Sequence, residues 1–213
     1  EFWSLDLAVT RDVLIPRPET ECLVEKALDY LAADSDSGRQ RILDLGTGSG
    51  AILIAMASEN SQHAYWGTDI SAAAIQIAQR NAIVHGLAAN IHFLVANWFS
   101  SFAVRTDLFD MIISNPPYIR RRDLKRLQPE IQAFEPLVAL DGSEDGLLCL
   151  RHIIQSAHLY LRPSGMLLLE MGYDQKASLK QIIQRCGQYE DVNFYTDYSG
   201  YDRIVAMRKQ AKR

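Results

Sequence analysis

The stretch Asp44-Leu45-Gly46-Thr47-Gly48-Ser49-Gly50 decides the fold. It follows a segment with the pattern of a strand, Arg41–Leu45, and leads into the apolar segment Gly50–Ser58, which is expected to be helical. Glycines permit a tight turn and let a ligand approach the backbone where side chains would clash. A strand, a glycine-rich turn and a helix in this order predict the first unit of a parallel α/β sheet with a ligand at the turn.

The rest of the chain continues this alternation of strand and helix. Strands are expected at Arg41–Leu45, Ala64–Asp69, Ile91–Ala96, Met111–Ser114, Gly165–Glu170, Val192–Asp197 and Arg203–Arg208. Helices are expected at Gly50–Ser58, Ala72–His85, Gly146–Leu161 and Gln175–Cys186. Such alternation predicts a largely parallel sheet. Because only Tyr198 to Asp202 separate the last two strands, these two should form an antiparallel hairpin.

The segment before this sheet is expected to be a small appendage. Strand-like patterns at Phe2–Val9 and Asp12–Ile15 predict a short β-hairpin, and Thr20 is expected to cap the helix that follows. We therefore expect two parts, a hairpin with a linking helix (1–33) and the main sheet domain (34–213), which begins in a polar loop. The chain has no initiating methionine, so we expect it to be part of a longer protein.

The overall composition is that of a soluble globular protein. Of 213 residues 48% are hydrophobic and 23% charged, and the net charge of −4 does not indicate a nucleic-acid binder. Cys22, Cys149 and Cys186 are widely spaced, which favours reduced thiols and a cytoplasmic location. The five histidines lack metal-ligand spacing, so no metal site is expected. No apolar stretch is long enough to cross a membrane.

Polar residues at the ends of the predicted strands indicate a nucleoside cofactor. Asp69 ends the second strand, where a carboxylate can accept hydrogen bonds from both ribose hydroxyls. Asn97, which follows the third strand, can pair with an adenine edge, and Trp98 or Phe99 can pack on the ring. A loose dinucleotide pattern also fits the glycine loop, but Asp-x-Gly-x-Gly-x-Gly is the form typical of S-adenosyl-L-methionine loops. The predicted cofactor-binding residues are Gly46, Thr47, Gly48, Ser49, Gly50, Asp69, Asn97, Trp98 and Asn115.

The tetrapeptide Asn115-Pro116-Pro117-Tyr118 follows the fourth predicted strand. Its two prolines remove two N–H donors and fix two φ angles, which gives a rigid turn. Carbonyls, an amide and an aromatic ring on such a turn suit a planar nitrogen group that is presented to an electrophile. We predict Asn115, Pro116 and Tyr118 as catalytic residues and all four as substrate-binding residues. Taken alone, the tetrapeptide would be interpreted first as a plain strand-ending turn, and it is the other motifs that favour a site.

Together these motifs resemble the protein-(glutamine-N5) methyltransferases of the HemK/PrmC type. The resemblance extends over nearly the whole chain and rests on Glu1-Phe2-Trp3, Leu14–Glu21, Asp44–Gly50, Asn115–Ile119, and Phe134–Leu140 with Asp145-Gly146. Members of this family methylate the glutamine of the Gly-Gly-Gln motif in peptide-chain release factors. They also carry a small helical amino-terminal domain, which this chain would lack. Asn97 stands where many relatives have Asp, and Glu170-Met171-Gly172 replaces the usual Glu-His-Gly.

The resemblance implies a fold, a cofactor and a partner. The fold would be a class I S-adenosylmethionine-dependent methyltransferase sheet, mostly parallel with an antiparallel last strand. S-adenosyl-L-methionine would be the methyl donor, S-adenosyl-L-homocysteine the product, and a release factor the protein substrate. We expect the Asn115 side-chain oxygen and the Pro116 carbonyl to accept the two amide hydrogens, while Tyr118 packs on the amide plane. Leu14 and Pro16–Pro18 would wall the pocket, with Arg17 as a structural anchor.

Three alternatives remain open on the sequence. A related branch of the family methylates a ribosomal protein of the large subunit at glutamine. The same tetrapeptide can hold adenine N6, and the basic run Arg120-Arg121-Arg122 with Lys125 and Arg126 could contact phosphates. A non-catalytic cofactor-binding module is the third alternative. We expect a monomer without a membrane partner or a stable nucleic-acid partner.

Overall fold

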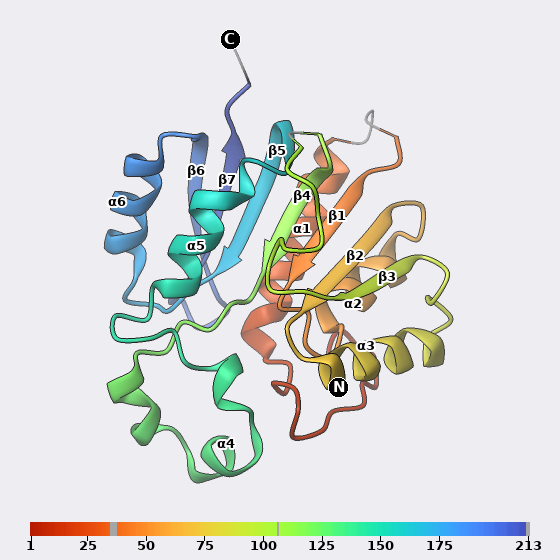
Figure 1. Ribbon diagram of the computed structural model, residues 1–213, viewed down its shortest axis with the longest axis vertical. Coiled ribbons are helices and arrows are strands. Elements are labelled where there is room, and N and C mark those ends of the chain that lie inside the picture. Colours follow the sequence, from red (N-terminus) through yellow and green to blue (C-terminus); the bar gives the residue numbers. More distant parts are fainter. Residues whose placement is uncertain (35–37, 106, 212–213) are drawn as a thin grey trace.

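A computed structural model describes residues 1–34, 38–105 and 107–211, so residues 35–37 of the expected polar loop lie outside the described residues. Strands and helices alternate along the described chain (Figure 1). The strands are β1 (Arg41–Leu45), β2 (Ala64–Asp69), β3 (Ile91–Val95), β4 (Phe109–Ser114), β5 (Leu161–Glu170), β6 (Tyr189–Thr196) and β7 (Asp202–Lys209). The longer helices are α1 (Pro18–Ala33), α2 (Ala51–Glu59), α3 (Ala72–Val84), α5 (Leu148–Ala157) and α6 (Lys176–Cys186).

The strands form one seven-stranded sheet in the order β3-β2-β1-β4-β5-β7-β6. The five strands from β3 to β5 are parallel, whereas β7 runs antiparallel to both β5 and β6. This arrangement confirms the expected parallel sheet with an antiparallel hairpin at its end. The bounds of β1 and β2 agree with the sequence pattern, and the other strands differ by a few residues.

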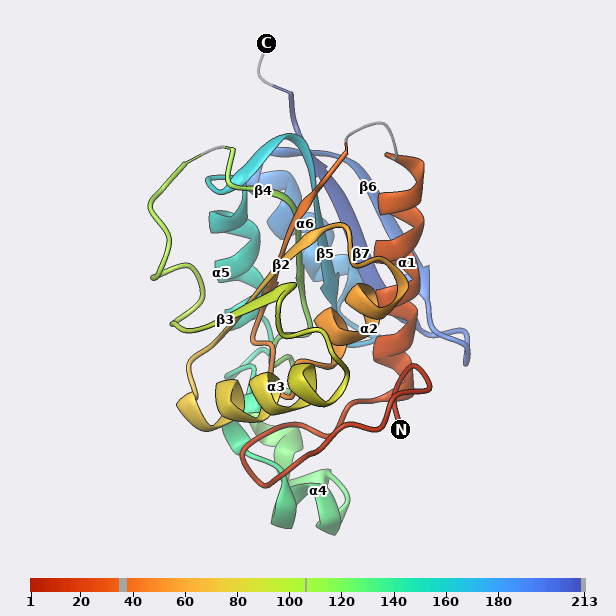
Figure 2. The same ribbon diagram turned by 90° about the vertical axis from the view of Figure 1, so that its right-hand side faces the viewer.

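Helices cover both faces of the sheet, as two views at right angles show (Figures 1 and 2). Ile42 of β1 packs with α1 and α2 on one face, and the next residue, Leu43, packs with α5 and α6 on the other. In β4, Ile113 and Ile112 divide between the same two cores. Strands buried on both faces read as continuous apolar runs, and this is why the sequence predicted them well.

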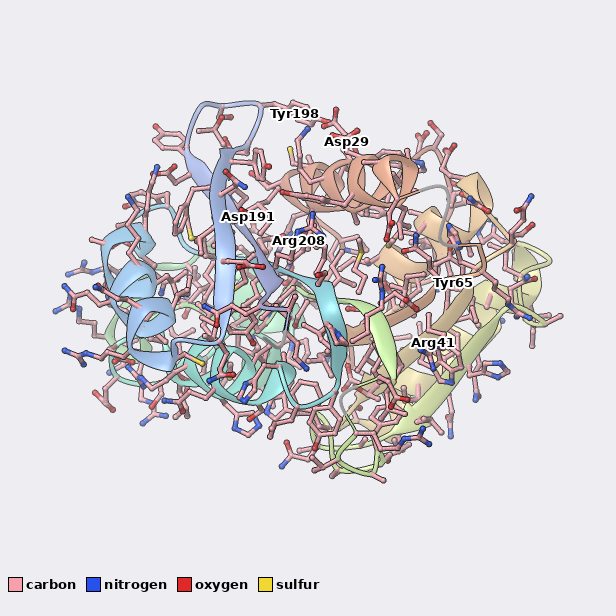
Figure 3. The ribbon with its side chains drawn as sticks, turned by 90° about the horizontal axis from the view of Figure 1, so that it is seen from above. Asp29, Arg41, Tyr65, Asp191, Tyr198 and Arg208 are labelled. Atoms are coloured by element: carbon pink, nitrogen blue, oxygen red, sulfur yellow. The ribbon has the colours of Figure 1, made fainter. Side chains whose placement is uncertain are left out.

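The two ends of the sheet differ in character. The end seen in Figure 3 carries Arg41, the first residue of β1, and an ion pair of 3.3 Å between Arg208 of β7 and Asp191 of β6. At the opposite end lie the short helix α4 (Pro129–Phe134) and the 3₁₀ segments Arg121–Arg126 and Leu137–Ala139. The sequence did not predict these short helical segments. Among the described residues, no helix has the length and apolar character needed to cross a membrane.

The predicted amino-terminal hairpin is wrong. Phe2 and Leu5 form an isolated bridge, and the rest of the segment before α1 has no regular strand. Its backbone bonds to side chains of two helices instead: Ala8 exchanges hydrogen bonds of 2.9 and 3.0 Å with the Asn81 amide, and the Trp3 N–H donates to Glu21 at 2.7 Å. These side chains satisfy backbone groups that a hairpin would have paired with each other.

Two smaller expectations are also corrected. Thr20 does not cap α1, which begins after Arg17 and has no side-chain cap; Thr20 lies inside the first turn, and its hydroxyl reaches another element. The helix expected at Gly146–Leu161 is shorter, because Leu161 already pairs with Phe109 at the start of β5. Cross-sheet pairing takes precedence over helical spacing at that boundary.

Candidate active site

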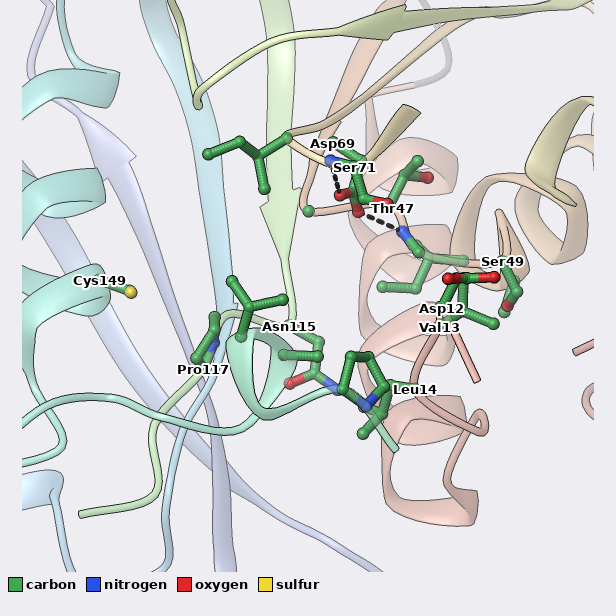
Figure 4. A pocket seen from close by; sticks show the side chains of 18 of the residues that line it. Asp12, Val13, Leu14, Thr47, Ser49, Asp69, Ser71, Asn115, Pro117 and Cys149 are labelled. Atoms are coloured by element: carbon green, nitrogen blue, oxygen red, sulfur yellow. Dashed lines mark hydrogen bonds between the residues drawn. The ribbon is translucent and has the colours of Figure 1, made fainter. Parts of the chain in front are cut away.

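A cavity of about 390 Å³ opens at the carboxyl edge of the parallel strands (Figure 4). It lies where the strand order reverses between β1 and β4, the place at which open α/β sheets bind ligands. The buried Ser114 hydroxyl donates to the Leu45 carbonyl at 2.6 Å and joins these two strands at their ends. The turns that follow β1 and β4 therefore leave the sheet side by side, and both line the cavity.

The glycine turn after β1 forms one wall. Gly46 and Gly48 have φ values of 72° and 56°, which side chains rarely adopt, and a Cβ at Gly48 would meet nothing within 4 Å. That space is available to a ligand that approaches the backbone. Gly50 does not line the cavity. It precedes α2 at φ 82°, and a Cβ there would lie 3.1 Å from Ala78, so this glycine serves the packing of α2 against α3.

Asp69 ends β2 and faces the glycine turn, as the sequence predicts. One of its carboxylate oxygens accepts the Gly48 N–H at 2.9 Å and the other accepts the Ser71 N–H at 2.9 Å (Figure 4). A carboxylate has about four lone-pair sites, so each oxygen can accept one further hydrogen bond. The backbone contacts hold the carboxylate rigidly at the cavity wall, and its remaining acceptors fit a pair of ribose hydroxyls.

The residues after β3 settle which aromatic ring faces the cavity. Asn97 and Trp98 line it, and the Trp98 ring lies 3.8 Å from the position of a Cβ on Gly46. Phe99 is buried and stacks on Tyr160, with ring centroids 4.4 Å apart and planes 4° from parallel. Phe99 is therefore a core residue, and Trp98 with Asn97 is the pair that could hold a purine.

The tetrapeptide after β4 divides between two neighbouring cavities. Asn115 and Pro117 line the large cavity. Pro116 and Tyr118 line a smaller cavity of about 110 Å³, which Asn115 lines as well. Asn115 is thus the residue of this motif that borders both cavities.

A chain of hydrogen bonds behind Asn115 was not predicted from the sequence. The Asn115 amide donates to the Thr20 hydroxyl at 3.0 Å, and Thr20 donates to Glu170 at 2.7 Å. The other Glu170 oxygen accepts the Tyr118 hydroxyl at 3.0 Å. We call Asn115, Thr20, Glu170 and Tyr118 the buried relay. No sequence motif joins Thr20 to Glu170, because 150 residues separate them.

The buried relay has a carboxyl group at its centre. Glu170 is 1% exposed, and burial raises the pKa of this carboxyl, while the hydrogen bonds from Thr20 and Tyr118 and the charge of Arg203 oppose the rise. Burial also raises the pKa of the Tyr118 hydroxyl, and the neighbouring Glu170 adds to the effect. Tyr118 is therefore a neutral hydrogen-bond donor to Glu170.

Segments far from the glycine turn complete the cavity. Leu14 and Pro16 line it, as expected, together with Pro136 from the loop before the second 3₁₀ segment. Arg17 forms an ion pair with the buried Glu135, which ties these two parts of the rim together. This contact agrees with an anchoring role for Arg17. Asp12, Val13 and Thr20 also line the cavity and were not among the predicted site residues.

The basic run is largely paired with acidic side chains. Arg120 pairs with Asp174 at 2.7 Å, and Arg121 pairs with Asp141 and Glu144, each at 3.0 Å. Arg126 donates to Asp123 at 3.2 Å. Among residues 1–34, 38–105 and 107–211, no group of three or more His, Cys, Asp or Glu could hold a metal ion.

Structural comparisons agree with this arrangement. The amino-terminal domain of human METTL16 in complex with SAH superposes with a TM-score of 0.68 at 18% identity, covering 96% of this chain and 76% of that one. A ribosomal protein L11 methylase from Lactobacillus delbrueckii subsp. bulgaricus gives a TM-score of 0.65 at 17% identity, over 93% and 82% of the two chains. At such identities the likeness establishes the fold alone, that of class I methyltransferases.

Sequence comparisons establish the family. Residues 36–211 match the model of a methyltransferase domain. The release factor glutamine methyltransferase of Buchnera aphidicola is 42% identical over 99% of this chain and 73% of its own length. That of Escherichia coli is 43% identical over 98% of this chain and 72% of its own length. The chain belongs to the release factor glutamine methyltransferase family.

Proposed function

We propose that this protein transfers a methyl group from S-adenosyl-L-methionine to the side-chain N5 of the glutamine in the Gly-Gly-Gln motif of release factors. Two relatives named release factor glutamine methyltransferase are 42% and 43% identical to this chain over 99% and 98% of its length. The observation that carries the proposal is the position of Asn115. Its carboxamide lines both cavities at the switch point of the sheet, with the nitrogen already bonded to Thr20.

We assign the cofactor to the turns after β1, β2 and β3. Asp69 would accept the ribose hydroxyls, the turn from Gly46 to Ser49 would face the amino-acid part, and Asn97 with Trp98 would hold the adenine. When bound there, the cofactor supplies an electrophilic methyl group on sulfur. The residues that line the cavity fit this assignment. The exposed Asn97 amide, the Asp69 carboxylate with its spare acceptor sites and the glycine turn lie at the carboxyl ends of β3, β2 and β1, which are neighbours in the sheet.

The protein's remaining task is to align the substrate amide. A glutamine nitrogen is a weak nucleophile because its lone pair is delocalised into the carbonyl, and correct orientation can supply a large part of the rate enhancement. The Asn115 Oδ1 and the Pro116 carbonyl would accept the two N–H groups of the substrate and turn the lone pair toward the methyl group. No general base is required before transfer, since the nitrogen becomes acidic only as the new bond forms.

The test is the substitution Asn115→Ala, assayed by transfer of a tritiated methyl group to a release factor. We expect kcat to fall roughly 10²-fold or more, as on removal of one oriented hydrogen-bonding group, with cofactor affinity within a few-fold of wild type. Asn90→Ala serves as the control, because the Asn90 side-chain amide lies outside the cavity lining and donates to the Ser61 carbonyl at 2.8 Å. Equal losses of kcat and of cofactor affinity would contradict the alignment role and make Asn115 a cofactor residue.

The choice of acceptor is tested in the same assay. Wild-type protein is offered a release factor with an intact Gly-Gly-Gln motif, the same factor with Gln→Ala, the glutamine-bearing ribosomal protein, and nucleic acid. We expect label on the intact factor alone. Label on the Gln→Ala factor, or only on the ribosomal protein or nucleic acid, would overturn the proposed substrate.

A further inference from the structure

We propose that Thr20 and Glu170 are positioning residues that decide which end of the Asn115 carboxamide faces the substrate. This inference rests on the proposed function, because it concerns the orientation of the group that receives the glutamine amide. Neither residue belongs to the tetrapeptide or to the glycine turn. Thr20 is on the first turn of α1 and Glu170 is the last residue of β5.

The direction of each hydrogen bond follows from the chemistry of Glu170. Both carboxyl oxygens of Glu170 accept a hydrogen bond, one from Thr20 and the other from Tyr118, and a hydroxyl has a single hydrogen to donate. At 2.7 Å from Glu170, the Thr20 hydroxyl commits its hydrogen to the carboxylate. Toward Asn115 the Thr20 oxygen can then act only as an acceptor, so the bond of 3.0 Å must come from the Asn115 NH₂ group. The Asn115 oxygen is left as the end that can accept the substrate's N–H groups.

The carboxylate is itself held in place. Its second oxygen accepts the Tyr118 hydroxyl, and the Arg203 guanidinium lies 3.5 Å from that same hydroxyl. Arg203 is in turn fixed by Asp197, at 3.1 Å. With both oxygens engaged and the side chain 1% exposed, Glu170 cannot turn away from Thr20 without leaving a buried donor unpaired, which is costly.

The opposite orientation of Asn115 is disfavoured for a specific reason. A flipped amide would place its oxygen against the Thr20 oxygen, whose hydrogen is already used, so that two acceptors would meet. It would also present NH₂ to the NH₂ of the substrate. The relay therefore favours a glutamine amide at this position over a glutamate carboxylate, which has no hydrogen to give to Asn115 or Pro116.

Three substitutions distinguish the direction of these hydrogen bonds from the packing of the same side chains. Glu170→Gln keeps the shape but lets the new NH₂ donate to Thr20, which frees the hydroxyl hydrogen for a flipped Asn115. Thr20→Val keeps the shape and removes the hydroxyl, and Thr20→Ser keeps the hydroxyl and removes only a methyl group. We expect Glu170→Gln and Thr20→Val to lower kcat roughly 10²-fold, a loss typical of a misplaced reacting group, and Thr20→Ser to restore most of it.

The matched control is Tyr30→Phe. Tyr30 is also on α1, and its hydroxyl bonds to that of Tyr195 on β6 at 2.9 Å, so its loss loosens the helix from the sheet without touching the relay. For every variant we would measure kcat for methyl transfer to a release factor, cofactor affinity by calorimetry, and Tm. A fourth measurement compares the inhibition constants of two non-reacting competitors: a truncated release factor with Gln→Glu in the Gly-Gly-Gln motif, and one with Gln→Ala.

The proposal expects wild type to bind the Gln→Glu competitor more weakly than the Gln→Ala one, and expects this preference to shrink in Glu170→Gln and Thr20→Val. A purely structural role would leave it unchanged. Wild-type kcat in both variants, a parallel loss of cofactor affinity, or an equal loss in Tyr30→Phe would each overturn the proposal. If wild type labels the ribosomal protein instead of a release factor, the proposed substrate is wrong. The same variants, assayed with the ribosomal protein as acceptor, then still test the roles of Thr20 and Glu170.

Discussion

The ribose contact assigned to Asp69 makes a quantitative prediction for Asp69→Ala. Each oxygen of this carboxylate holds one backbone N–H, from Gly48 or Ser71, and has one acceptor site left for the cofactor. A hydrogen bond to a charged group contributes about 1.5–3 kcal/mol. Loss of two such bonds, partly offset by water that replaces the carboxylate, should cost about 3 kcal/mol, which corresponds to a Kd roughly 10²-fold weaker.

Calorimetric titration with S-adenosyl-L-homocysteine measures this change, and a 2′,3′-dideoxy analogue identifies its origin. If Asp69 contacts the ribose, removal of the hydroxyls and removal of the carboxylate disrupt the same interaction, so the two effects should be strongly non-additive. Asp107→Ala is the control, because Asp107 pairs with the exposed Arg105 outside the cavity. Full additivity of the two losses would refute the ribose contact, even if Asp69→Ala weakened binding through the displaced Gly48.

Three further predictions concern the supports of the site. Burial raises the pKa of Asp44 to about 7, so the folded protein retains a proton that the unfolded chain loses above about pH 4. The free energy of unfolding of Asp44→Asn, measured in urea, should therefore rise relative to that of wild type between pH 4 and 7, by up to about 4 kcal/mol. A difference that does not change with pH would contradict this. Gly50→Ala should lower the free energy of unfolding by about 1–3 kcal/mol, because φ is 82° and the new Cβ would crowd Ala78; an unchanged Tm would argue against this strain. Arg17→Ala should lower the free energy of unfolding by about 2 kcal/mol, because it leaves Glu135 buried without its ion-pair partner. A double-mutant cycle with Glu135→Gln should show a coupling energy above about 0.5 kcal/mol. Strict additivity would mean that the pair is not coupled.

The parts of the fold that the sequence predicted well are those governed by local patterns. The strands Arg41–Leu45 and Ala64–Asp69 were placed at their observed bounds because each is a short, mostly apolar segment that has a partner strand on either side in the sheet. The predicted amino-terminal hairpin was wrong for the converse reason. An alternating pattern indicates a strand only when a partner strand is available, and here Asn81 and Glu21 supply the hydrogen bonds.

The same division holds within the site. The glycine turn, Asp69 and Asn115 each lie at the carboxyl end of a parallel strand. Because parallel strands bring their carboxyl ends to one edge of the sheet, the sequence alone could predict that these residues lie together. The choice between Trp98 and Phe99 required the packing of Phe99 on Tyr160, which is a tertiary contact.

By itself, the sequence determined the order of strands and helices, the strand-ending turns that line the cavity, and membership in the family. Only the tertiary structure decided how Asn115 is oriented. That orientation depends on Thr20 and Glu170, which lie 95 and 55 residues from Asn115 along the chain and meet it only in the folded protein. Hydrogen-bond polarity depends on which donors and acceptors are brought within about 3 Å of each other, and no periodicity in a sequence records that.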